Sequence, residues 1–217
     1  RLYGKPETFE DFVYYSQLTQ AKAVSMAVAG HRIDFPRCGG TLYWQVNDCW
    51  PAPTWSSIDY NWNWKALQYE VKKDYEDVAV VAKYDDLENR SYYIVNDLPD
   101  KYTSTIQVQL IDLKGRTVKE WSEEVCFVGS GSKMIGFDEG VIAEMTKSNL
   151  LVKFTWNNAK GGSFTRDFAN IKNDYKKAKI EDITLTIDAI DETAKTAVIS
   201  IENQRFVRDF WLTSSQF

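Results

Sequence analysis

A chain of 217 residues with 44% hydrophobic and 26% charged residues has the composition of a globular protein, with room for one large domain or two small ones. Its net charge is −5 and its basic residues are scattered, which excludes the clustered basic face of a nucleic-acid-binding protein. No apolar run reaches the roughly 18–20 residues that a membrane-spanning helix needs, so no membrane partner is expected.

The first predicted element is a helix that ends near Gly30. Thr8 and Asp11 resemble a capping box at its start, and apolar residues then recur at helical spacing. Residues 41–46, Thr-Leu-Tyr-Trp-Gln-Val, lack polar alternation, which is typical of a strand buried on both faces in a parallel sheet or barrel. A second helix is expected over residues 64–75. Helix, strand and helix in this order indicate an α/β unit.

From residue 76 onward the pattern changes to short β-rich segments separated by turn signals. Strands are predicted at residues 77–83, 91–95, 104–111, 118–128, 150–156 and 163–168. Several strands with regularly spaced turns predict an immunoglobulin-like β-sandwich over residues 76–172.

A polar, lysine-rich stretch at residues 170–179 precedes a third segment, residues 180–217. Further strands are predicted there at residues 183–187, 197–201 and 206–212. Three strands are too few to close a sandwich, so we expect the start of a second, incomplete one. The chain is therefore expected to be part of something larger.

The cysteine and histidine content argues against a metal site. Cys38, Cys49 and Cys126 lack the CxxC spacing of a zinc or redox site, and we expect them to be buried free thiols. His31 is the single histidine, which excludes sites built from several histidines. It lies near the end of a predicted helix, where an imidazolium is favoured by the negative end of the helix dipole.

Tryptophan is concentrated in one short region. Residues 41–57, TLYWQVNDCWPAPTWSS, hold three of the eight tryptophans. The stretch GTLYWQVNDCWP at residues 40–51, followed by WSSIDY at 55–60 and WKALQY at 64–69, closely resembles β-mannosidases of glycoside hydrolase family 2. DFVYYSQLTQA at residues 11–21 and RFVRDFW at residues 205–211 fit the same family.

The resemblance implies a multi-domain fold. Residues 1–75 would form the end of a (β/α)8 catalytic barrel, comprising helix 7, strand 8 and helix 8. Residues 76–172 would be an immunoglobulin-like β-sandwich, and residues 180–217 the start of a second β-sandwich. The implied partners are β-mannosides or manno-oligosaccharides and the rest of the parent enzyme's barrel, with no metal or organic cofactor.

The resemblance also implies a retaining mechanism that uses two glutamates. In the family the acid/base follows an asparagine, as Asn-Glu, and the nucleophile lies in a Ser-Glu-aromatic-Gly motif. The chain holds no Asn-Glu, and its one Ser-Glu, Ser122-Glu123, lacks the following aromatic residue and glycine. We therefore expect no catalytic residue in this chain, no activity of the chain alone, and both motifs upstream of residue 1.

Four residues near the end of the predicted strand 8 are candidates for substrate binding. Trp44 matches a subsite tryptophan of the family, with a plain barrel-core aromatic as the alternative. Asn47 and Asp48 would orient a sugar hydroxyl or a neighbouring side chain, or cap a turn. Trp50 would wall the pocket or pack under the proline-rich loop. Structural roles are expected in the loop and second helix for Trp55, Asp59, Trp62 and Trp64, and in the sandwich cores for Trp121, Trp156 and Trp211.

Two alternatives stay open at this point. One is another family 2 exo-glycosidase, of the β-glucosaminidase, β-galactosidase or β-glucuronidase type. The other is a non-catalytic carbohydrate-binding module built from β-sandwiches, against which the helix–strand–helix unit argues. The compartment is left open, with periplasmic, secreted or lysosomal locations favoured over the cytoplasm.

Overall fold

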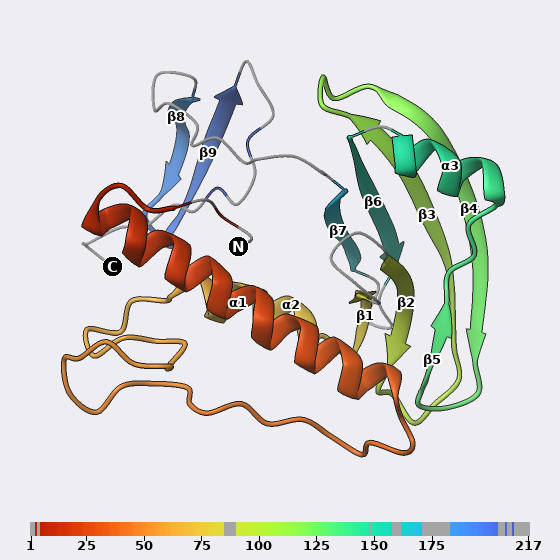
Figure 1. Ribbon diagram of the computed structural model, residues 1–217, viewed down its shortest axis with the longest axis horizontal. Coiled ribbons are helices and arrows are strands. Elements are labelled where there is room, and N and C mark those ends of the chain that lie inside the picture. Colours follow the sequence, from red (N-terminus) through yellow and green to blue (C-terminus); the bar gives the residue numbers. More distant parts are fainter. Residues whose placement is uncertain are drawn as a thin grey trace.

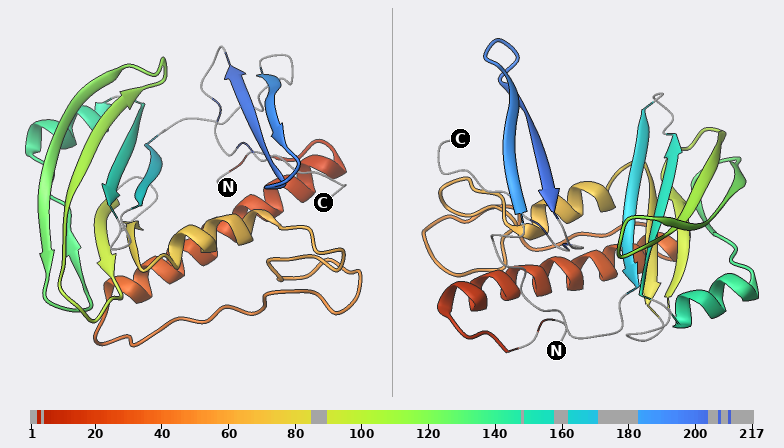
Figure 2. Two further views of the ribbon diagram at one scale, coloured as in Figure 1. Left: turned by 180° about the vertical axis from the view of Figure 1, so that it is seen from behind. Right: turned by 90° about the horizontal axis from the view of Figure 1, so that it is seen from above.

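The computed structural model shows a sheet-rich protein with a pair of helices (Figure 1). α1 (Phe9–Ile33) and α2 (Ala66–Asp74) lie side by side, and two β-sheets stand beside the C-terminal end of α1. A separate β-hairpin lies near the N-terminal end of α1 in each view (Figures 1 and 2). The structure describes residues 3, 5–84, 90–147, 149–157, 162–170, 183–203, 207 and 210.

The capping signal predicted for the first helix is confirmed. Thr8 is the N-cap of α1, and its side chain accepts a hydrogen bond from the Asp11 backbone N–H at 3.1 Å. The helix runs to Ile33, three residues beyond the predicted end. α2 packs along α1 through small and branched side chains, whose buried members are Leu18, Ala21, Ala66, Leu67 and Val71.

The strand predicted at residues 41–46 is not formed in this structure. The segment belongs to no strand and bends at Trp44 and Val46. The Val46 carbonyl accepts from the Ile58 N–H at 2.8 Å, and an isolated bridge joins the next residue, Asn47, to Ile58. Leu42 is 99% exposed and Val46 is exposed as well. A buried parallel strand needs hydrogen-bonded neighbours at both edges, and none of the described strands lies alongside residues 41–46.

Seven strands form two sheets in which every pairing is antiparallel. One sheet has the order β1–β2–β5, with β1 (Val78–Tyr84), β2 (Arg90–Asn96) and β5 (Gly131–Met134). The other has the order β4–β3–β6–β7, with β3 (Tyr102–Asp112), β4 (Thr117–Phe127), β6 (Leu150–Asn157) and β7 (Ser163–Asn170).

The two sheets face each other across one hydrophobic core. Alternation in β3 buries Ile106, Val108 and Leu110 while their polar neighbours face outward. Aromatic rings pack where the sheets meet: the centroid of the Tyr92 ring on β2 lies 5.1 Å from that of the Phe154 ring on β6. The predicted strands therefore assemble into a sheet-rich body.

β1 is buried on both faces. Val78 and Val80 point into the core between the sheets, whereas Ala79 and Val81 pack against Ala29 of α1. The continuous apolar run in the sequence therefore reflects two different neighbours, one on each face of the strand. As a result, β1 joins the helical pair to the sheets.

Several segments differ from the expectations. β5 and a helix, α3 (Glu139–Lys147), were not predicted, because residues 131–134 form a short edge strand and the helix is brief.

The hairpin of β8 (Ile183–Asp191) and β9 (Thr196–Asn203) matches two predicted strands, and its residues are almost all exposed. The predicted strand at 206–212 lies outside the described residues except for positions 207 and 210, and the 170–179 stretch lies outside them after residue 170.

The tryptophans expected in the sandwich core are placed differently from one another. Trp156 is buried between the sheets, and its indole N–H donates to the Val78 carbonyl at 3.2 Å. Trp121 is partly buried at the margin of the core and meets Phe137 edge to face at 5.2 Å. Trp211 lies outside the described residues.

The cysteines are free, as predicted, but they are not buried. Cys49 and Cys126 are exposed and Cys38 is half-buried. Cys126 occupies an outward position of β4 between two buried residues, so the strand's alternation decides its exposure. Within the described ranges, no group of three or more histidine, cysteine, aspartate or glutamate side chains is placed to hold a metal ion, and no helix is long and apolar enough to cross a membrane.

Candidate functional site

Residues 41–65, here called the tryptophan loop, carry large aromatic side chains into solvent. Trp44 and Trp62 are about three-quarters exposed, at 74% and 73%, and Trp50 and Trp55 are about two-thirds exposed. Several exposed aromatic side chains in one loop make it a candidate binding surface, because water solvates apolar rings poorly. The loop projects from the helical pair on the side away from the hairpin (Figures 1 and 2).

The interior of the tryptophan loop is polar. Asp48 is 6% exposed and Ser56 is fully buried. The Thr54 hydroxyl donates to Asp48 Oδ1, while Lys65 Nζ lies 3.3 Å from Asp48 Oδ2 and donates to Ser56 Oγ at 2.7 Å. We call Asp48, Thr54, Ser56 and Lys65 the polar cluster of the loop. Its hydrogen bonds, rather than an apolar core, fold the segment and leave the indoles outside.

Backbone contacts complete the loop. Asp48 N–H donates to the Ile58 carbonyl at 3.1 Å, and Ile58 N–H donates back to the Val46 carbonyl at 2.8 Å. Ser57 connects this pairing to the helices, since its Oγ lies 2.7 Å from Gln68 Oε1 of α2 and 2.9 Å from the Tyr43 hydroxyl. The chain on either side of Asp48 is thus fixed to α2.

Electrostatics within the polar cluster favour an ionised Asp48. Burial raises the pKa of this carboxyl, but hydrogen bonds from Thr54, Ser56 and Lys65 and the charge of Lys65 outweigh burial, so that the pKa is lowered from its ordinary value of 3.8. An anionic Asp48 can then accept from the hydroxyl and pair with the ammonium at neutral pH.

The four sequence-predicted site residues lie close together along the chain but differ in accessibility. Trp44 and Trp50 are exposed, so neither packs in a core in this structure. Asn47 is also exposed, and its side-chain amide donates to the Asp48 carbonyl at 3.3 Å. Asp48 faces inward and its carboxylate is occupied by the polar cluster. It is therefore suited to orienting neighbouring side chains, one of the three roles considered for it.

The residues expected to be structural are divided in the same way. Asp59 stabilises a turn by accepting from the backbone N–H groups of Asn61 and Asn63 at 2.8 and 2.9 Å. Trp64 packs edge to face against Tyr69 of α2 at 5.2 Å. Trp55 and Trp62 have mostly exposed indoles, and the expectation that they hold the loop in place stays a prediction.

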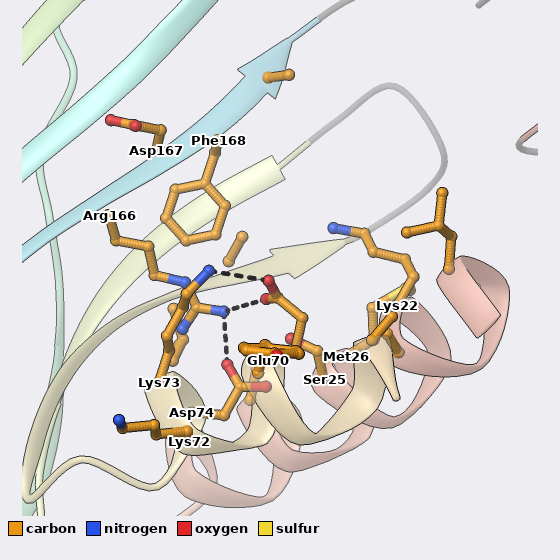
Figure 3. Close-up of a pocket in the computed structure, with 18 of the residues that line it drawn as sticks. Lys22, Ser25, Met26, Glu70, Lys72, Lys73, Asp74, Arg166, Asp167 and Phe168 are labelled. Atoms are coloured by element: carbon orange, nitrogen blue, oxygen red, sulfur yellow. Dashed lines mark hydrogen bonds and ion pairs between the residues drawn. The ribbon is translucent and has the colours of Figure 1, made fainter. Parts of the chain in front are cut away.

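A second feature, a cavity of about 890 Å³, lies between α1, α2, β1 and β7 (Figure 3). Arg166 of β7 points from the sheet toward α2, where its guanidinium lies 2.6 Å from Asp74 Oδ1 and 3.3 Å from Glu70 Oε2. Asp74 is completely buried, and burial raises its pKa even though Arg166 opposes the shift. Because the guanidinium charge is already paired, this cluster connects sheet and helix rather than offering a free cation to a ligand.

Sequence reasoning did not identify this connection. Arg166 lies between Phe164 and Phe168 at the inward positions of β7, so a charge at the centre of an apolar alternation was the available signal. A related contact comes from α1, where Arg32 donates to the Asp74 and Asp77 carbonyls and pairs with Asp97 at 2.9 Å.

Comparisons with known proteins link the chain to β-mannosidases. It is 36% identical over 127 residues to β-mannosidase A of Aspergillus clavatus, covering 53% of this chain and 13% of that protein. It is 34% identical over 108 residues to a probable β-mannosidase of Caenorhabditis elegans and 32% identical over 109 residues to β-mannosidase of Capra hircus, covering 45% and 47% of this chain and 12% of each relative. The chain thus spans about an eighth of the length of these relatives. No protein-family model matches it.

Solved structures share the fold. β-D-mannosidase from Dictyoglomus thermophilum superposes with a TM-score of 0.66 at 21% identity, covering 88% of this chain and 23% of that one. A complex of the exo-chitosanase CsxA of Amycolatopsis orientalis gives a TM-score of 0.66 at 16% identity, covering 94% of this chain and 27% of the other. Together with the curated relatives, these matches confirm the resemblance to β-mannosidases expected from the tryptophan-rich sequence.

Proposed function

We propose that the chain is the C-terminal part of a retaining exo-β-mannosidase that hydrolyses terminal non-reducing β-D-mannose residues by double displacement. The observation that carries this proposal is the 32–36% identity to proteins named β-mannosidase over about half the chain. The exposed indoles of the tryptophan loop support it, because flat aromatic faces pack well against the C–H groups of a pyranose.

The proposed architecture assigns residues 1–75 to the end of a (β/α)8 barrel, with α1 as helix 7 and α2 as helix 8. Residues 76–172 would form the immunoglobulin-like β-sandwich, and residues 180–217 would begin a second one. The segment at residues 41–46 would become strand 8 when the barrel's other strands pair with it. The segment lies in the chain between α1 and α2, which pack against each other, and this order supports the assignment.

In this proposal the two catalytic glutamates lie outside the chain, which contributes binding groups alone. Trp44 and Trp50 would stack on the sugar, and the exposed Asn47 amide would donate to one of its hydroxyls. Asp48 would act through the loop, because its carboxylate is buried among hydroxyl and ammonium groups. The chain by itself would be inactive.

The test uses the full-length protein and a pair of chromogenic substrates. We expect hydrolysis of 4-nitrophenyl β-D-mannoside, with the β-anomer of mannose as the first product in a proton NMR time course. The matched 4-nitrophenyl β-D-glucosaminide should react at least a hundredfold more slowly. Preference for the glucosaminide would favour the exo-β-glucosaminidase alternative. Turnover of neither sugar would leave the β-galactosidase and β-glucuronidase types and the non-catalytic carbohydrate-binding role.

A further inference from the structure

Lys65 occupies a position that does not suit a lysine. It is the N-cap of α2, where Ser, Thr, Asp and Asn are favoured, and its side chain makes no capping hydrogen bond. A positive charge there also lies at the positive end of the helix dipole. A residue of α1 caps the α2 N-terminus instead, because Gln17 Oε1 accepts a hydrogen bond from the Ala66 N–H at 3.2 Å. A locally unfavourable residue of this kind indicates a role outside its own helix.

That role is visible in the contacts of the lysine side chain. The Lys65 ammonium is withdrawn from water, with its side chain 13% exposed, and it reaches back across the loop to Asp48, whose side chain is 2% exposed. It also contacts Ser56 Oγ at 2.7 Å and the Thr54 carbonyl at 3.4 Å. The three N–H donors of the ammonium thus have three acceptors within the tryptophan loop.

We propose that Lys65 and Asp48 form a positioning pair that holds the tryptophan loop in its sugar-binding shape. The proposal rests on the proposed function and adds to it two residues that act without touching the sugar. Asp48 lies between Trp44 and Trp50 in the chain, and its backbone is paired with Ile58. A displacement of Asp48 therefore changes the position of both flanking tryptophans.

Loss of the ammonium affects more than one contact. Asp48 would keep the Thr54 hydroxyl but lose its cation, which leaves a buried carboxylate without a counter-charge. Water can solvate this carboxylate and lower its free energy, but only if the segment around Asp48 opens. The expected result is a loop whose indoles no longer occupy fixed positions, while the helical pair keeps its own apolar contacts.

The test is a double-mutant cycle in the full-length protein, with Lys65→Met, Asp48→Asn and the combination. On 4-nitrophenyl β-D-mannoside we expect kcat/KM to fall at least tenfold in each single variant and no further in the double variant, because both members act as one unit. Lys119→Met is the matched control, since Lys119 forms an exposed pair with Asp138 at 3.0 Å in the sandwich, and it should stay within twofold of the wild type.

A second readout is independent of activity. Hydrogen exchange at the Asp48 and Ile58 amides should become at least tenfold faster in Lys65→Met and remain unchanged in Lys119→Met. If Lys65→Met does not fold, Lys65→Gln replaces it, because the amide can still donate to Ser56 but carries no charge.

The outcomes separate the two proposals. Faster exchange with unchanged kcat/KM would overturn the positioning pair and leave the proposed function standing, as would losses that simply add in the double variant. If the wild-type protein cleaves no β-mannoside, the proposed function fails, and the positioning pair is tested by hydrogen exchange alone. Unchanged exchange in Lys65→Met would then overturn the pair, and faster exchange would support it.

Discussion

Replacement of Trp44 by alanine separates a binding role from a packing role. Trp44 is 74% exposed, so its removal should lower the free energy of unfolding by less than about 0.5 kcal/mol. A sugar stacked on one face of the indole would cover about 70 Å², roughly a third of what a tryptophan can bury. At about 25 cal/mol per Å², that contact contributes about 1.8 kcal/mol, or roughly twentyfold in kcat/KM.

The assay measures kcat and KM of the full-length Trp44→Ala variant on 4-nitrophenyl β-D-mannoside, together with its melting temperature. Trp55→Ala is the matched control, because that indole is similarly exposed in the same loop, and the hydrogen bond from Gln20 is accepted by the Trp55 backbone carbonyl, which the substitution keeps. We expect a loss of at least tenfold for Trp44→Ala and less than twofold for Trp55→Ala. Unchanged kinetics with a lower melting temperature would refute the reasoning, as would equal losses in both variants.

Three further predictions concern stability of the full-length protein. Phe154→Ala removes a fully buried ring and should cost about 3–5 kcal/mol, measured by hydrogen exchange in β3 and β6. Arg166→Met leaves the buried Asp74 without its guanidinium and should cost about 3 kcal/mol at pH 7. Because the folded pKa of Asp74 is raised, that loss should shrink as pH falls and the carboxyl binds a proton, and adding Asp74→Asn should restore the melting temperature. The folded pKa of Asp48 is lowered, so the ionised carboxylate stabilises the fold above about pH 3.8, and this stabilisation is lost as pH falls through the folded pKa. The wild type should therefore lose stability below pH 4 more steeply than Asp48→Asn.

Local signals in the sequence predicted local structure well. Thr8 and Asp11 marked the start of α1 because a capping contact involves residues three apart. The alternation of β3 predicted which of its side chains face the core, because a strand exposes one face and buries the other. Neither inference needs knowledge of distant parts of the chain.

Inferences that depend on distant neighbours were less accurate. Residues 41–46 have the composition of a buried strand, but a strand forms only when another strand supplies its hydrogen bonds. The strand that is buried on both faces is β1, since α1 covers its second face. The polar cluster was also out of reach, because the pairing of Lys65 with Asp48 across seventeen positions leaves no periodic trace.

In the candidate site, the sequence named candidate binding residues, whose role stays a prediction, and missed the contacts that fold the loop around them. Trp44 and Trp50 were singled out by a resemblance to β-mannosidases, and resemblance identifies residue types at matching positions. The inward orientation of Asp48 follows from Thr54 and Ser56, two residues that no motif distinguishes from ordinary loop positions. Geometry was therefore needed to separate a group that would meet the sugar from one that shapes its surroundings.

The way in which β1 is enclosed has a consequence for building chimeras of such proteins. The change in sequence pattern at residue 76 invites a cut there, yet a cut would strip Ala29 from the outer face of the strand and separate Arg166 from Asp74. A sandwich taken from a homologue would bring its own partner surface and would not fit the resident helices. Exchangeable cassettes should therefore include the end of α1, all of α2 and the sheets together.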